Sequence, residues 1–288
     1  CEREFCLTCE TSFLSHMLMT CPPGLATQPL NFLRTLRQVR EAAALGLIEG
    51  KDELEARADH SPIRRIQAFL RFILEQLNKE ELSRRQAVGA NDESSGPTAC
   101  EAIFGTRINE TLKCSQCSVT TTKEMRSFQV DLQYPSTREI GHRPTFVELL
   151  TKSLHVSQEM RAWCEGHKAY TRMKQNRLPF SLPTVLSVNL GMSDFLKDLH
   201  WWGIDTLAHP TSDAFSGKVA ERWLPHFIQV ILNPEAKTLE ARHALDESQF
   251  QHVANSEIYE LTGFVVFSRN IEDEIKKGSD LRNTKSSN

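Results

Sequence analysis

The sequence predicts an α+β fold in which a helical part comes first and strands follow. Through the first ninety residues, apolar side chains recur every three or four positions, which is typical of helices. From Ile103 to Tyr134 the pattern changes to an alternation rich in Thr, Val and Phe, which is typical of strands. One pair of potential metal ligands lies in a turn of this strand-like region, and a second pair lies in strand-like sequence further along the chain. Helices and strands that are segregated along a chain favour the α+β class.

Three helices are expected in residues 1–90, which we assign to a helical, thumb-like part. The first carries Phe13 on an apolar face, and the second begins at Asn31 as its N-cap. In the third, Ser61 is the expected cap and Pro62 takes the first turn. An apolar stripe on this third helix predicts packing against the other two. The stripe consists of Ile63, Ile66, Phe69, Leu70, Ile73, Leu74 and Leu77.

Residues 103–190 are expected to form a β-rich region with turns at the two ligand pairs. A polar stretch at 88–99, rich in turn-forming residues, separates this region from the helices. Thr145 and Glu148 have the spacing of a capping box, which predicts a helix over 145–154. Further strands are expected in "LPTVLSVNLGM", "RWLPHFIQVIL" and "IYELTGFVVF".

The rest of the chain is expected to contain an insertion, more strands and a tail. Residues 191–222 are polar, and their adjacent Trp201 and Trp202 are expected to contact a partner. Residues 223–267 hold the later strands. Residues 268–288 are highly charged without apolar periodicity, so we expect a disordered tail.

The bulk composition limits the class of protein. At 288 residues and 40% hydrophobic composition, the chain can bury a substantial core. A formal net charge of −3 gives no global attraction to nucleic acid or to an anionic membrane, so such binding has to be local. No run approaches the roughly 18 apolar residues of a membrane span, and the first residues lack the layout of a signal peptide. We expect a soluble, intracellular chain without a membrane partner, and the missing initial Met predicts a fragment.

Two ligand pairs, Cys114 with Cys117 and Cys164 with His167, have the spacing of zinc knuckles. A Cys-x-x-Cys turn places two thiolates about one ligand-to-ligand distance apart, and two such turns complete a tetrahedral shell. The pattern predicts one structural zinc ion with no open coordination position. Two alternatives remain open: turn and buried residues that happen to be spaced alike, and a redox Cys-x-x-Cys, although the residues after Cys117 are a poor helix start.

A second group of cysteines, Cys1, Cys6, Cys9 and Cys21, lies in the first helical segment. Cys6 and Cys9 share a face with Phe13, where a thiol behaves as a small hydrophobe, so core packing is expected and a second metal site stays open. Eight cysteines in a chain of this length are too sparse for a disulfide scaffold.

Catalytic groups do not assemble in the sequence. Cys100 lies in a loop-like stretch without a Gly-rich elbow, and His226 and His252 are expected to be surface or interface residues rather than a general base. No Asp-x-Glu pair occurs anywhere in the chain, which speaks against a two-metal nuclease site. Arg34, Arg37 and Arg40 fit a solvated helix face better than a nucleic-acid groove. We expect no catalytic residues in this chain.

Three stretches together resemble the fingers and palm of ubiquitin-specific proteases: "IFGTRINETLKCSQCSVTTTKEMRSFQVDLQYP", "TFVELLTKSL" and "WCEGHKAYTRMKQNRLPFSLPTVLSVNL". The resemblance implies a papain-like cysteine-protease scaffold over 1–267, with a helical thumb, β fingers and an incomplete palm. It also implies that the nucleophile and His boxes lie outside this segment. His167 stands where that family generally has Cys. A fragment of an active ubiquitin-specific protease remains the alternative, and a zinc-dependent RNA-binding module, which predicts salt-sensitive poly(A) binding by the isolated chain, remains a third option.

A narrower resemblance covers about 1–267 and rests on "EFCLTCETSFLSHML", "NFLRTLRQVREAAALGL", "RAWCEGHKAYT" and "YELTGFVV". These stretches are similar to the inactive ubiquitin-protease-like domain of catalytic subunits of the poly(A)-nuclease deadenylation complex. The resemblance implies a non-catalytic scaffold beside an Asp-Glu-Asp-Asp exonuclease domain that shortens poly(A) tails. It implies four partners: the Pan3 pseudokinase subunit, the exonuclease domain, poly(A) mRNA and poly(A)-binding protein. A cytoplasmic location is expected.

Overall fold

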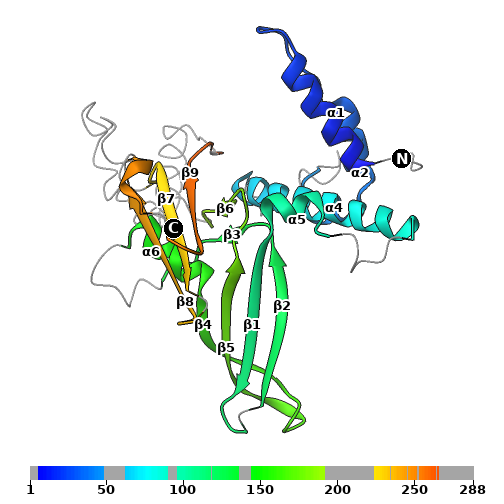
Figure 1. Ribbon diagram of the computed structural model, residues 1–288. Coiled ribbons are helices and arrows are strands. Elements are labelled where there is room, and N and C mark those ends of the chain that lie inside the picture. Colours follow the sequence, from blue (N-terminus) through cyan, green and yellow to red (C-terminus); the bar gives the residue numbers. More distant parts are fainter. Residues whose placement is uncertain are drawn as a thin grey trace, which may run out of the picture.

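A computed structural model gives the fold of the chain. It describes residues 6–48, 62–89, 96–135 and 144–265, apart from 118, 192–223, 234, 245, 252 and 264. Within these ranges the chain forms a helical part, a long four-stranded sheet and a smaller α+β part, each around its own apolar cluster (Figure 1). The predicted α+β fold class is thus confirmed. No helix in the described ranges is long and apolar enough to cross a membrane.

The helical part packs around an apolar cluster contributed by all four of its helices. These are α1 (Leu7–Thr20), α2 (Leu30–Gln38), α3 (Arg40–Ala44) and α4 (Pro62–Ala87). The cluster consists of Leu7, Phe32, Leu36, Ala42, Phe72 and Ile73. The predicted second helix is in fact two helices, because the backbone is extended at Val39. The prediction of Asn31 as N-cap is wrong, since Pro29 takes that position and Asn31 lies within α2.

The predicted apolar stripe on α4 is partly wrong. Phe72, Ile73 and Leu74 are buried, whereas Phe69 and Leu70 are 38% and 42% exposed. Phe69 still touches the neighbouring helix, because its ring meets Phe32 edge-on with centroids 6.5 Å apart. The buried face of α4 therefore includes Phe72, which lies outside the stripe, and leaves Phe69 and Leu70 of the stripe partly in solvent.

The four-stranded sheet follows a short helix, α5 (Ala99–Phe104), and is antiparallel throughout in the order β2-β1-β5-β4. Its strands are β1 (Thr106–Cys114), β2 (Thr120–Ser127), β4 (Val156–Cys164) and β5 (Ala169–Ser181). The predicted strands on either side of the first ligand pair are thus present. Two hairpins, β1–β2 and β4–β5, end at the same tip, which projects away from the helices (Figure 1).

The third part packs α6 (Phe146–Leu154) against short strands. The predicted capping box is confirmed: the Thr145 hydroxyl accepts from the Glu148 N–H, and the Glu148 carboxylate accepts from the Thr145 N–H at 2.7 Å. The strands are the parallel pair β3 (Val130–Asp131) and β6 (Val188–Asn189), and an antiparallel sheet of β8 (Thr238–Ala244), β7 (Phe227–Asn233) and β9 (Ser256–Glu260), with a 3-10 turn η1 (Glu247–Gln249). The apolar cluster consists of Val130, Leu132, Phe146, Leu149, Leu150, Leu154, Ile228, Val230, Leu232 and Leu239.

Polar contacts connect the helical part to the rest of the chain. Arg71 of α4 pairs with Asp131 of β3, and the Thr98 hydroxyl at the start of α5 bonds the Asn78 side chain of α4. Arg126 of β2 pairs in turn with Glu101 of α5. The predicted strand "LPTVLSVNLGM" is reduced to the two residues of β6. The predicted insertion, with Trp201 and Trp202, and the predicted tail at 268–288 lie outside the described residues, except for Gly191.

Candidate metal centre at the tip of the long sheet

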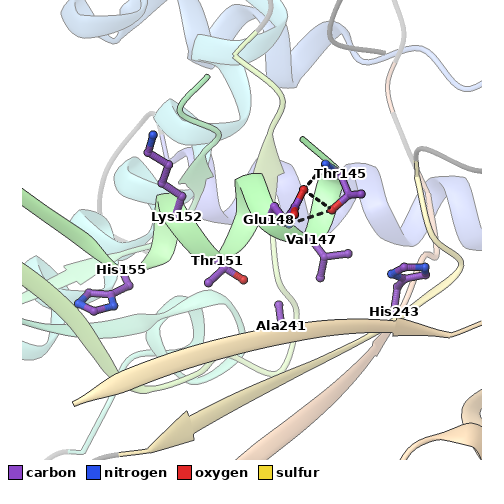
Figure 2. A pocket seen from close by; sticks show the side chains of 8 residues that line it. All are labelled: Thr145, Val147, Glu148, Thr151, Lys152, His155, Ala241 and His243. Atoms are coloured by element: carbon purple, nitrogen blue, oxygen red, sulfur yellow. Dashed lines mark hydrogen bonds between the residues drawn. The ribbon is translucent and has the colours of Figure 1, made fainter. Parts of the chain in front are cut away.

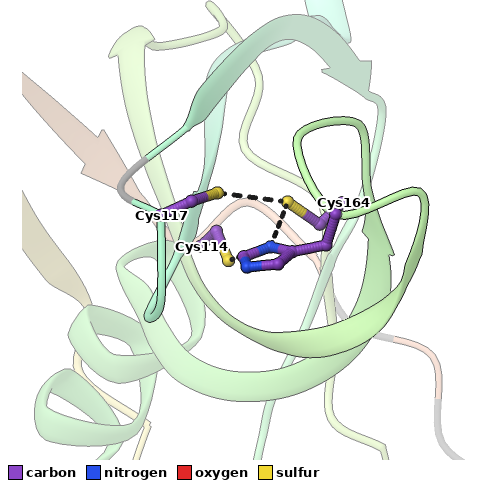
Figure 3. Close-up of side chains that lie close together, drawn as sticks. Cys114, Cys117 and Cys164 are labelled. Atoms are coloured by element: carbon purple, nitrogen blue, oxygen red, sulfur yellow. Dashed lines mark hydrogen bonds between the residues drawn. The ribbon is translucent and has the colours of Figure 1, made fainter.

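Strand register brings the two ligand pairs together at the sheet tip. Cys114 is the last residue of β1 and lies opposite Met173 of β5, while Cys164 ends β4 opposite Ala169. Because both cysteines end strands that flank β5, their hairpin turns lie side by side. The three thiols of Cys114, Cys117 and Cys164 converge on one point in Figure 3.

The distances between the ligand atoms fit a tetrahedral zinc shell. Zn–S and Zn–N bonds of about 2.3 and 2.0–2.1 Å imply S···S distances of about 3.8 Å and S···N distances of about 3.5 Å. Cys117 Sγ lies 3.5 Å from Cys164 Sγ. Nδ1 of His167 lies 3.4 Å from Cys164 Sγ and 3.7 Å from Cys114 Sγ. All four ligand atoms lie within 4.8 Å of one another, so the group could hold one metal ion.

The backbone around the second pair is shaped for close approach. A Cβ atom on Gly166 would lie 3.0 Å from Cys117 Sγ and 3.1 Å from a Val119 methyl group, so only glycine leaves both neighbours in place. Lys168, directly after His167, has a left-handed φ of 49°, which closes the turn back into β5. The cluster of Cys114, Cys164 and Met173 is buried behind the site, with Leu112 and Ala162 packed against it.

Hydrogen bonds favour the thiolate forms of two ligands. The Thr171 hydroxyl, 3.5 Å from Cys114 Sγ, together with the backbone N–H groups of Cys117 and Gln116, lowers the pKa of Cys114 to about 6. The His167 ring lowers the pKa of Cys164, and the same contact raises the pKa of His167. Since thiolates are the metal ligands, this environment favours a cation between the side chains at neutral pH.

The pKa of the Cys117 thiol shifts in the opposite direction. A hydrogen bond from the Val119 N–H lowers its pKa, but burial and the neighbouring thiols of Cys164 and Cys114 outweigh this and raise the pKa overall. Three close thiolates repel one another, so the third holds its proton until a cation arrives. With all four coordination positions supplied by side chains, a bound zinc ion would have no place for water or substrate.

The other cysteines do not form a second metal site within the described part of the chain, where the four knuckle residues are the one group of three or more potential ligands. The Cys6 thiol lies 3.6 Å from a Glu80 carboxylate oxygen, and burial raises its pKa. The Cys21 thiol donates to the Leu25 carbonyl at 3.3 Å. The expectation of core packing is wrong for Cys9, which is exposed because α1 buries the neighbouring Leu7 side instead. Cys1 lies outside the described residues.

The described cysteine and histidine side chains outside the metal centre lack the Cys–His contact that a cysteine hydrolase requires. Cys100 is buried in helix α5 rather than in a loop, and burial, followed by the charges of Glu81 and Glu101, raises its pKa. The His226 ring is solvent-exposed and lies 3.4 Å from Glu260. Among the described residues, Cys–His contacts occur solely within the knuckle cluster. His252 lies outside the described residues.

An open groove of about 410 Å³ runs between α6 and β8. Figure 2 shows His155 and His243 at opposite ends of it, with Thr151 and Ala241 between them. Among the described residues, the one carboxylate that lines it, Glu148, completes the capping box, and His155 Nε2 lies 3.1 Å from the Asn176 side-chain oxygen. The groove therefore lacks a paired acid and base aimed at a common point.

Sequence reasoning missed two residues of the metal centre. Gly166 lies between the ligands of the second pair, where a short Cys-x-Gly-His turn could have indicated close packing. Thr171 carries no such signal, because its position beside Cys114 depends on the β1–β5 register, which pairs Cys114 with Met173, two residues after Thr171 on the same face of β5.

Comparisons with known proteins agree with this fold. The sequence profile of the family described as ubiquitin carboxyl-terminal hydrolase matches residues 1–280, so the chain belongs to that family. The catalytic subunit Pan2 of the PAN2-PAN3 deadenylation complex from Mus musculus is 34% identical over 207 residues, covering 70% of this chain. The Homo sapiens subunit is 33% identical over 211 residues. The chain spans 17% of the length of each of these relatives.

Solved structures show the same fold at low sequence identity. The Pan2 catalytic unit of Neurospora crassa, containing protease and nuclease domains, superposes with a TM-score of 0.66 at 19% identity, covering 90% of this chain and 39% of that one. The pseudoubiquitin-hydrolase-RNase module of Saccharomyces cerevisiae PAN2 gives 0.58 at 17% identity, covering 88% and 36%. The chain is thus a ubiquitin-hydrolase-like domain similar to the Pan2 module, and the alternative of an active protease is not favoured.

Proposed function

We propose that this domain is a non-catalytic scaffold in the catalytic subunit of a deadenylation complex, where it supports shortening of poly(A) tails by an exonuclease domain elsewhere in the longer protein. The observation that carries this proposal is the 34% identity, over 70% of the chain, to a relative named as that subunit. On this proposal the partners are the Pan3 pseudokinase, the exonuclease domain, poly(A) mRNA and poly(A)-binding protein, and the location is the cytoplasm.

Within the scaffold, the metal centre holds one structural zinc ion. Three cysteines and one histidine are a ligand set that zinc prefers, and the S···S and S···N separations match a tetrahedral shell. His167 in place of a fourth Cys keeps the shell complete, because zinc accepts imidazole nitrogen at a similar bond length. Zinc there would hold the two hairpin ends together and supply no Lewis acid to a substrate.

The state of the thiols supports the absence of protease chemistry. A nucleophilic cysteine needs a lowered pKa and access to a base. In the described residues the lowered thiol pKa values belong to Cys114 and Cys164, whose sulfur atoms are buried in the knuckle cluster. Cys100 and Cys6, outside that cluster, have raised pKa values.

A turnover assay separates the scaffold from an active protease. Zinc-loaded chain incubated with a fluorogenic ubiquitin C-terminal substrate is expected to release no fluorophore above a buffer control, while an active ubiquitin-specific protease in the same buffer does. Thiol-dependent release that a cysteine alkylating agent abolishes would contradict the proposal. The deadenylation role is tested in the longer protein, where deleting this domain should slow poly(A) shortening in the presence of its partner subunit.

A further inference from the structure

One face of the long sheet, near the tip, gathers aromatic and basic side chains. Side chains alternate along a strand, and directly paired residues share a face. In β4 this places Trp163, Arg161 and Glu159 together, and their partners in β5 are Tyr170, Arg172 and Lys174. Lys174 is paired in turn with Lys113 of β1. We name this surface the platform face; it consists of Trp163, Tyr170, Arg161, Arg172, Lys174 and Lys113.

The aromatic pair of the platform face is open to solvent. Trp163 is 46% exposed and Tyr170 is 66% exposed. Their rings meet edge-on, with centroids 5.6 Å apart and planes at 76°. The indole N–H of Trp163 donates to Glu165 at 2.9 Å, which fixes the ring next to the turn. Two large rings held in place but left uncovered offer a surface for another flat, apolar group.

The basic side chains beside the rings are mostly unneutralised. Arg172 lies 3.5 Å from Glu159, but both side chains are well exposed, so this pair contributes little. Arg161, Lys174 and Lys113 are exposed and form no ion pair within the described part of the chain. The remaining carboxylate, Glu165, is neutralised by Lys168 at 2.7 Å. The platform face therefore has a net positive charge although the chain is formally −3.

The opposite face of the same strands has a different character. It carries the buried Cys114, Cys164 and Met173 of the metal centre. Further along the strands, Glu110 neutralises Arg177 at 2.7 Å and accepts from Gln175. Of the cations on that face, Arg177 is neutralised by Glu110 and Lys123 lies opposite the same carboxylate, whereas the four cations of the platform face share the single carboxylate Glu159. The contrast shows that the positive charge is a property of one surface rather than of the whole sheet.

We infer that the platform face binds single-stranded nucleic acid. Exposed rings give bases a stacking surface, and arginines and lysines in the neighbouring rows attract the phosphates; proteins that bind single strands combine these two features. Successive cross-strand pairs on the platform face are about 6.6 Å apart along the strands. An extended nucleic-acid strand that leaves the aromatic pair would therefore pass the arginine and lysine pairs in turn. A duplex hides its base faces and could use only the cations. This inference deepens the proposed function and rests on it for the choice of oligoadenylate as ligand, because poly(A) mRNA is a partner there; the surface itself is one that neither the fold nor the metal centre requires.

Stacking is tested with the zinc-supplemented chain and a fluorescein-labelled oligoadenylate of about 12 nucleotides, within the range that single-strand sites span. We expect Tyr170→Ala to weaken binding, measured by anisotropy, roughly 5- to 150-fold, the range that loss of one stacked base produces. Tyr170→Phe keeps the ring and should retain nearly full affinity. Tyr170 is mostly exposed, so both variants should melt like the parent chain. Equal affinity of all three proteins would overturn the inference, as would an absence of binding at low salt.

The ionic part is tested through salt dependence. Lys174→Ala should reduce the slope of log affinity against log salt by roughly 0.7, the value for one phosphate contact on a single strand. Lys123→Ala is the matched control: Lys123 is exposed but lies on the opposite face, beside Glu110. An equal effect of both changes would contradict a site on the platform face. So would competition by polyglutamate or by duplex RNA as strong as that by unlabelled oligoadenylate, since neither offers free bases. None of these outcomes bears on ubiquitin turnover or zinc content, so failure here is distinguishable from failure of the proposed function.

Discussion

At the scale of single residues, the metal centre depends on more than its ligands. The ligand spacing in the sequence indicates Cys114, Cys117, Cys164 and His167, because such spacing is a local property of two turns. The roles of Gly166 and Thr171 are not visible in the sequence. Gly166 is needed because a sulfur atom from the other hairpin lies against it, and Thr171 matters because strand pairing places its hydroxyl beside Cys114. Both are consequences of tertiary structure.

Gly166→Ala should weaken zinc binding. The new Cβ would lie 3.0 Å from Cys117 Sγ and 3.1 Å from a Val119 methyl group, so one hairpin has to shift away from the other. Overpacking of this kind corresponds to roughly 10- to 100-fold weaker affinity. Competition with a zinc-binding dye measures the zinc affinity of the variant. Gly263→Ala is the control, because a Cβ atom at that position would meet no other atom within 4 Å, and it should bind zinc like the parent chain. Equal affinities of the two variants would argue against close packing at Gly166.

Thr171→Val should shift the pH at which zinc is released. The Thr171 hydroxyl is the largest cause of the lowered pKa of Cys114, about 6, so this thiol is already ionised at neutral pH. The stabilisation that this thiolate gives the folded chain is complete above the ordinary thiol pKa of 9.0 and is lost as the pH falls through about 6. Without the hydroxyl the pKa rises, so zinc is released at a higher pH. A zinc titration across pH 5–8 measures the midpoint, and Thr122→Val on exposed β2 should leave it unchanged.

At the scale of elements, the sequence predicts that a helix or strand is present better than it predicts where that helix or strand begins and ends. The capping box fixes α6 because Thr145 and Glu148 act locally. The break at Val39 and the exposure of Phe69 arise from how helices pack, which apolar periodicity does not encode. The strands of the third part are shorter than their apolar runs suggest, since strand limits depend on hydrogen bonds to neighbours distant in sequence. The short β6, paired with β3, is an example.

Thr145→Ala should destabilise the third part of the molecule. It removes the acceptor for the Glu148 N–H at the start of a helix whose buried residues contribute to the largest apolar cluster. Loss of such a cap costs about 1 kcal/mol, within a range of about 0.5–2 kcal/mol. Chemical denaturation followed by circular dichroism measures the change. Thr145→Ser keeps the acceptor and should be close to neutral; an equal loss in both variants would show that the hydroxyl is not responsible.

At the scale of the whole molecule, the three apolar clusters are unequal. The helical part and the third part each bury a set of large side chains, whereas the cluster at the sheet tip, among the described residues, consists of Cys114, Cys164 and Met173. So small a cluster does not hold two hairpins in register by the hydrophobic effect alone. On the proposed function, a metal bound by the four knuckle residues would supply the missing constraint. The fold class follows from composition and periodicity, but the small size of this cluster becomes visible only once burial is known.

The central claim is that one zinc ion holds the two hairpin ends together at the tip of the long sheet. Metal analysis of the purified chain tests this claim most directly. Mass spectrometry of the desalted protein is expected to find about one zinc per chain. Cys164→Ser should lose most of that zinc and melt several degrees lower, while Cys9→Ser, which changes an exposed thiol outside the site, should match the parent chain in both respects. A metal-free parent chain that melts at the same temperature with and without added zinc would contradict the account.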